Sequence, residues 1–98
     1  MKGFKMMRKE EIYKKEVGVL LDKVDEKFYV VYNYSVFEVN EVGARIIDLC
    51  NGSNSIDEIT VKLAKHFQKD YEIVYSDVMA YIDSLKENRI VEICNSKE

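Results

Sequence analysis

The sequence predicts a small α+β domain in which three antiparallel strands are followed by three helices, in the order β-β-β-α-α-α. In the first half, β-branched and aromatic residues gather in short runs separated by polar turns, which is typical of strands. In the second half, apolar residues recur at helical spacing behind capping residues. A chain of 98 residues has room for one core, and 47% apolar with 34% charged residues is typical of a soluble globular domain.

The predicted strands occupy residues 17–24, 27–32 and 36–39. The polar segment 25–27 and the short segment 33–35 join them, so we expect a tight hairpin and a meander with strand order 1-2-3. Residues 1–16 fit neither period. They are expected to be a basic N-terminal arm that is weakly structured or contains a short strand near Ile12.

The first helix is expected to begin after Asn40, because an Asn side chain can accept hydrogen bonds from the free N–H groups of the first turn. Apolar residues follow at helical spacing at Val42, Ile46, Leu49 and Cys50. Asn51-Gly52 is expected to end this helix, since Gly takes a left-handed conformation without side-chain strain.

The second helix opens with a capping box at Ser55 and Glu58 and is expected to run to about Lys69. Residues 71–75 are predicted to be a linker, and Ser76 is predicted to cap the last helix. The apolar segment 90–93 is expected to return to the sheet edge or the core, and residues 94–98 to form a loose tail.

Composition and motifs favour binding over catalysis. Residues 1–16 carry six Lys/Arg and three Glu, whereas residues 17–98 have a net charge of −6, and an acidic body repels nucleic acid. His66 has no ligand partner at a suitable spacing, and Cys50 and Cys94 form no CxxC pair. No catalytic set, metal site or cofactor is expected, and without a membrane span or secretory signal the expected location is the cytoplasm.

The edge of strand 36–39 is the predicted binding surface. It is not blunted by Pro or Lys, so its free backbone groups can pair with an extended peptide. If the last helix lies beside this edge, Val78, Tyr81 and Leu85 would form an apolar wall. The alternative is that Val78, Ile82 and Leu85 are plain core residues, with Tyr81 covering them.

Several motifs together resemble those of the PqqD-like domains, also called RiPP recognition elements. The motifs are an Asn-x-x-Gly turn at 40–43 inside FEVNEVGARIIDLCNG, the helix opening SIDEI, and the terminal pattern DVMAYIDSLKENRIV. The resemblance covers about residues 17–91. It departs from compact members in a longer stretch before Phe37 and in the basic N-terminal arm.

The resemblance implies a winged helix-turn-helix-like fold over residues 17–93 that binds the leader segment of a ribosomally made precursor peptide. The leader would add as a strand beside the third strand and be clamped by the third helix. A free-standing member would be a non-catalytic peptide chaperone that serves a separate enzyme, such as a radical-SAM maturase or a lasso-type protease. The implied contacts are backbone contacts at Val36, Phe37, Glu38 and Val39, and side-chain contacts at Asp77, Val78, Tyr81, Ser84 and Leu85.

The alternative function is that of a winged-helix DNA-binding regulator, because the topologies overlap. The second helix offers the only basic face for it, formed by Lys62, Lys65, His66 and Lys69. The sequence leaves open whether the protein is a monomer or a dimer.

Overall fold

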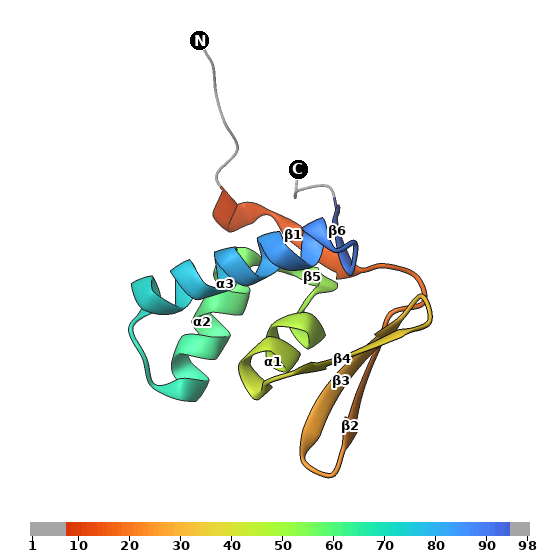
Figure 1. The fold of residues 1–98 in the computed structure, drawn as a ribbon. Helices are drawn as coiled ribbons and strands as arrows, with labels where there is room; N and C mark the ends of the chain where they lie inside the picture. Colours follow the sequence, from red (N-terminus) through yellow and green to blue (C-terminus); the bar gives the residue numbers. More distant parts are fainter. Residues whose placement is uncertain (1–7, 95–98) are drawn as a thin grey trace.

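The computed structural model describes residues 8–94, in which three helices pack beside two small antiparallel sheets (Figure 1). The first sheet is formed by β2 (Leu20–Val24), β3 (Lys27–Tyr32) and β4 (Ser35–Val39). The second is formed by β1 (Ile12–Lys15), β5 (Asn51–Ser55) and β6 (Val91–Cys94), with β1 in the middle. The helices are α1 (Glu41–Leu49), α2 (Ile56–Phe67) and α3 (Tyr71–Glu87), and a 3-10 turn, η1 (Arg8–Glu10), precedes β1.

The predicted meander is confirmed, with strand order β2-β3-β4. Both of its turns have two residues with positive φ, at Asp25 and Glu26 (51° and 69°) and at Asn33 and Tyr34 (56° and 66°). These are the left-handed values of a type I′ turn, whose twist matches that of the strands. The first strand begins at residue 20 instead of 17, because Gly18 has a φ of 91° and turns the chain just before it.

The second sheet was not predicted as a unit. The short strand near Ile12 and the return of segment 90–93 are both confirmed, and β6 pairs with β1 from Val91 to Cys94. β5 was missed because its sequence, NGSNS, carries no apolar alternation. This sheet joins the two ends of the described chain, and Tyr13 of β1 is fully buried in the core. The predicted loose tail 94–98 begins one residue too early, because Cys94 pairs with Ile12 in β6. Residues 1–7 and 95–98 lie outside the described residues.

The predicted N-caps of α1 and α2 are confirmed, whereas the predicted end of the first helix at Asn51-Gly52 is wrong, because these two residues begin β5. The Gly43 N–H donates to Oδ1 of Asn40 over 2.8 Å, and the capping box of Ser55 and Glu58 is complete. α1 ends at Leu49, where the C-cap is Cys50, and Nζ of Lys15 donates to the carbonyl oxygens of Ile47 and Cys50 over 3.2 and 3.3 Å. The favourable charge at this C-terminus therefore comes from β1 and not from the helix itself.

The predicted linker at residues 71–75 is wrong, because α3 already begins at Tyr71. Tertiary contacts explain the earlier start: Val74 is buried one turn before Val78, and the Tyr71 hydroxyl donates to Asp57 of α2. Ser76 consequently lies inside the helix and caps nothing. Asp70 is the N-cap, although its side chain makes no capping hydrogen bond.

The core lies between the helices and the inner faces of the two sheets. Its fully buried members include Tyr13, Val30, Ile46, Ile47, Ile56, Ile59, Val78, Ile82 and Val91. Val42, which was expected in the apolar stripe of α1, is exposed, and Ile47 takes the core position. No helix within residues 8–94 is long and apolar enough to cross a membrane.

Candidate functional site

The outer edge of β4 carries unpaired backbone groups. The two-residue turn makes Tyr32 and Ser35 a closing pair that exchanges hydrogen bonds, and this pattern alternates along an antiparallel ladder. Phe37 and Val39 therefore point their backbone groups at β3, whereas Val36 and Glu38 point theirs away from it. Within residues 8–94, no other backbone segment bonds to Val36 or Glu38.

An apolar pocket of about 270 Å³ lies beside this edge, between the meander and α3. Phe37 and Val39 line it from β4, and Tyr81, Ser84 and Leu85 line it from α3. The remaining lining residues are Val30, Ile47, Asn88 and Ile90. The same two strand residues that bond to β3 thus turn their side chains into the pocket, while their neighbours offer backbone groups to solvent.

The Tyr81 ring of α3 lies against Gly43 of α1. A Cβ atom built on Gly43 would lie 2.7 Å from Cζ of Tyr81, which is too close for any real Cβ contact. The glycine of the Asn-x-x-Gly turn is therefore needed for the ring to sit there. Burial raises the pKa of the Tyr81 phenol, so the pocket presents a neutral hydroxyl at neutral pH.

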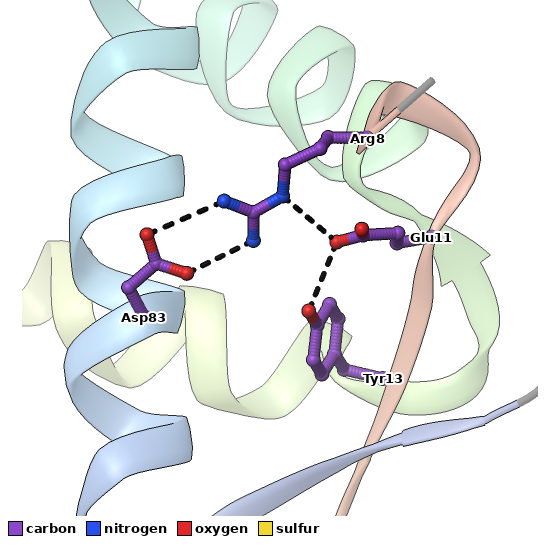
Figure 2. A network of polar contacts seen from close by, with 4 residues as sticks. All are labelled: Arg8, Glu11, Tyr13 and Asp83. Carbon is purple, nitrogen blue, oxygen red and sulfur yellow. Dashed lines mark hydrogen bonds and ion pairs between the residues drawn. The ribbon is translucent and has the colours of Figure 1, made fainter. Parts of the chain in front are cut away.

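A polar network holds the segment before β1 against the opposite side of α3 (Figure 2). The Arg8 guanidinium donates to both carboxylate oxygens of Asp83, over 2.9 and 3.4 Å, and its Nε donates to Oε1 of Glu11 over 3.0 Å. The Tyr13 hydroxyl donates to the same Glu11 oxygen over 2.9 Å. The hydrogen bond from Arg8 lowers the pKa of Asp83, and burial raises that of Tyr13 to about 12. The network braces α3 two residues after Tyr81.

The structure brings together five of the nine residues that the sequence placed at the binding surface. Phe37, Val39, Tyr81, Ser84 and Leu85 line one pocket, and Val36 and Glu38 supply the free edge. Val78 is fully buried, as the alternative assignment to the core required, and so is Ile82. Asp77 is exposed and does not line the pocket.

Sequence reasoning missed four lining residues. Val30 and Ile47 are inward-facing core residues whose far side forms the floor of the pocket, and no sequence signal separates them from other core positions. Asn88 and Ile90 follow the end of α3, where only the position of the helix next to the sheet brings them to the pocket. Asn88 donates its side-chain N–H to the Ser84 carbonyl over 2.8 Å, which fixes the rim.

Chemistry beyond binding has little support in this part of the chain. Among residues 8–94, no three His, Cys, Asp or Glu side chains gather in a group that could hold a metal ion. His66 is exposed, as expected, and its ring meets that of Phe67 edge-on at 4.7 Å. Burial raises the pKa of the Cys50 thiol to about 12, so this thiol is not a nucleophile at neutral pH.

An open strand edge beside an apolar, helix-lined pocket is an arrangement that peptide-recognition domains use. The family described as coenzyme PQQ synthesis protein D (PqqD) matches residues 18–91. The chain therefore belongs to the PqqD family, and the resemblance inferred from its motifs is confirmed. No curated protein sequence matches the chain significantly.

Two solved structures share the fold. One is the solution structure of the PqqD truncation of Methylobacterium extorquens PqqCD, described as a functional, stand-alone RiPP recognition element. Its TM-score is 0.73 at 19% identity, over 83% of this chain and 88% of that chain. The other is TbiB1 in complex with the TbiA(beta) leader peptide, with a TM-score of 0.71 at 20% identity, over 81% of this chain and 94% of that chain. The predicted three-stranded sheet with three helices is thus the fold of these proteins, and the winged-helix label stays a prediction.

Proposed function

We propose that this protein binds the leader segment of a ribosomally synthesised precursor peptide and presents it to a separate modifying enzyme, without catalysing a reaction itself. The leader adds as a fourth strand beside β4, and the pocket next to α3 receives its inward-facing side chains. The modifying enzyme belongs to a class such as the radical-SAM maturases or the lasso-type leader peptidases. Membership of the PqqD family and the leader complex of TbiB1 support this function.

One observation carries the proposal: β4 combines a free edge, at the backbone groups of Val36 and Glu38, with an inner face on which Phe37 and Val39 line the apolar pocket. A strand that pairs with this edge points every second side chain towards the inner face of the sheet. Backbone bonds would set the register of the peptide, and the pocket would select an apolar side chain. DNA binding finds no comparable support, since neither the family nor the similar structures point to it.

The test is a titration of the isotope-labelled protein with a synthetic leader from the precursor gene beside its own, followed by amide NMR shifts. We expect shifts concentrated in 36–39 and 81–90, with a dissociation constant of about micromolar or below, as is common for small interfaces. Shifts confined to α2 with duplex DNA, and none with the leader, would instead favour the regulator.

A pair of proline variants tests whether the leader forms backbone hydrogen bonds with β4 or only lies near it. Glu38→Pro removes an edge N–H that the leader would need, so its affinity should fall at least about tenfold. Lys23→Pro is the matched control, because its N–H also points away from the meander, on the opposite edge at β2, where it donates to Oδ1 of Asp22. Circular dichroism must show both variants folded. Equal leader affinity for both variants would rule out pairing at β4.

A further inference from the structure

The outer face of the meander is apolar and uncovered. Register places Leu20, Val31 and Val36 in one row across the three strands, and Leu20 and Val36 are 63% and 64% exposed. These side chains point away from the pocket, because their neighbours Val30 and Phe37 face inward. In Figure 1 the meander extends away from α2 and α3, and its main helix contacts are with α1, on the inner face.

Large apolar side chains concentrate around this sheet. Of the ten that are strongly exposed within residues 8–94, three lie on the outer face of the meander, Leu20, Val24 and Val36, and Tyr34 lies in one of its turns. Tyr34 is fully exposed and holds a φ of 66°, a conformation in which Gly or Asn would be less strained. Exposed apolar side chains that gather on one face mark an interaction surface when they are part of a larger apolar contact.

Charge on this face selects the kind of partner. The row next to the apolar one is Asp22, Tyr29 and Glu38, so a carboxylate stands on each side of the ring. The row beyond it adds Lys27 beside Val24, so acidic side chains on these rows outnumber basic ones by two to one. Neither carboxylate takes part in any of the ion pairs formed among the described residues. Two copies stacked through this face would bring four such carboxylates into a partly dry interface, where like charges repel. A partner with an apolar patch and flanking Lys or Arg side chains fits instead.

The face is too small to form a stable interface by itself. Three strands about 4.8 Å apart and five residues long, at about 3.4 Å each, present on the order of 250 Å². A stable interface needs about 800 Å² per partner. The face must therefore be part of a larger contact, and a leader added beside β4 would extend it by one strand, with its outward side chains continuing the row of Leu20 and Val36.

We infer that the outer face of the meander, centred on Leu20, Val31 and Val36, is the docking surface for the modifying enzyme, through an apolar patch of that enzyme flanked by basic side chains. This inference rests on the proposed function, since the enzyme would contact the face and the docked leader together. The leader groove and the enzyme surface then lie on opposite faces of the same sheet. Binding of one partner leaves the other surface open.

The experiment uses the full chain, the synthetic leader, and the purified modifying enzyme encoded beside the precursor gene. The test variant combines Leu20→Gln with Asp22→Lys, both on β2 and remote from the leader edge. The control variant combines Val61→Gln with Asp48→Lys, which makes the same chemical changes at exposed helix positions. Affinity for the enzyme, with leader present, and affinity for the leader alone are measured for each protein by calorimetry.

We expect the test variant to lose at least about tenfold in affinity for the enzyme, as truncation of a central contact does, while its leader affinity stays within about twofold. The control variant should match the wild type in both. Wild-type affinity of the test variant for the enzyme would overturn the inference and leave the proposed function intact. A wild-type protein that binds no leader would instead refute the proposed function.

Sedimentation of each protein alone distinguishes a second copy from the enzyme. We expect wild type and test variant to sediment with the same mass. A wild-type dimer that the test variant converts to monomer would overturn the inference, because the face would then be occupied by a second copy of this chain.

Discussion

Gly43→Ala is expected to destabilise the protein although it places a better helix former in a helix. The glycine lies in the first turn of α1, where alanine normally stabilises by about 0.5–1 kcal/mol. The added methyl, however, would lie 2.7 Å from Cζ of Tyr81, and relieving such an overlap costs about 1–3 kcal/mol. The net expectation is a loss of about 0–2.5 kcal/mol in the free energy of unfolding, with a central value of about 1 kcal/mol.

The cause can be isolated by removing the ring. In a Tyr81→Ala background the methyl meets no ring, so Gly43→Ala should there raise the free energy of unfolding by about 0.5–1 kcal/mol. The sign of the effect therefore reverses between the two backgrounds. The coupling energy between the two sites is expected to be about 1–3 kcal/mol.

Urea unfolding followed by far-ultraviolet circular dichroism measures all four proteins of this cycle, with equal m-values as the check on two-state behaviour. Gly18→Ala is the control, because that position has open space around it and a φ of 91°. Its cost is conformational and should be the same with or without Tyr81. If Gly43→Ala has the same effect in both backgrounds, the close approach of α1 and α3 does not explain the glycine.

Three further outcomes follow from the structure. Tyr34→Gly should raise the free energy of unfolding by about 1 kcal/mol, measured by urea unfolding, because it removes a side chain from a left-handed turn position. Asp83→Asn should lower the free energy of unfolding at neutral pH, because pairing with Arg8 lowers the pKa of Asp83. The difference in free energy between wild type and variant should be largest above the ordinary carboxyl pKa of about 4 and should vanish as the pH falls through the lowered pKa. Unfolding curves taken from pH 7 to pH 2 measure it. A thiol reagent should label Cys94 but not the fully buried Cys50 in the native protein, and both after denaturation, as counted by mass spectrometry.

Elements with a local chemical signal could be predicted from the sequence. The Asn40 cap and the capping box of Ser55 and Glu58 each need only side chains and backbone within one turn, and both are present. The meander was predictable for the same reason, since its turns and its apolar runs are contiguous in the chain.

Elements held by distant contacts could not be predicted. β5 is a strand because β1 and α2 position it, and its five polar residues give no period-2 signal. The first turn of α3 lacks a side-chain cap, and a Ser-Asp pair further on imitates one. Burial of Val74 and the bond from Tyr71 to Asp57 decide the true start, and both depend on where α2 lies.

The sequence predicts those features of the candidate site that depend on strand alternation. It does not predict how deeply each side chain is buried. Period 2 along 35–39 separates residues whose side chains face the pocket from those whose backbone faces solvent, but only the register with β3 decides which is which. Proline at Val39 would therefore remove an N–H that bonds to β3 and break the ladder inside the meander. Proline at Glu38 removes a backbone N–H at the free edge and leaves the ladder intact. On α3, helical spacing puts Val78, Tyr81 and Leu85 on one stripe. Only the position of the helix against the sheet decides that Val78 is fully buried, whereas Tyr81 and Leu85, one and two turns later, line the pocket.

In the proposed function, the same alternation gives one short strand two separate surfaces. In β4 the inward side chains of Phe37 and Val39 line the pocket, and the outward side chains of Val36 and Glu38 belong to the uncovered face. The backbone groups of these outward residues are also the ones left free at the edge, so a leader would pair with Val36 and Glu38 without covering their side chains. A substitution that keeps the backbone, such as Val36→Thr, should then weaken enzyme docking while leader pairing persists. Glu38→Pro removes both an edge N–H and a carboxylate of the uncovered face, so it should weaken binding of both partners. If Val36→Thr loses leader affinity in parallel with enzyme affinity, the edge and the outer face of β4 are not independent surfaces.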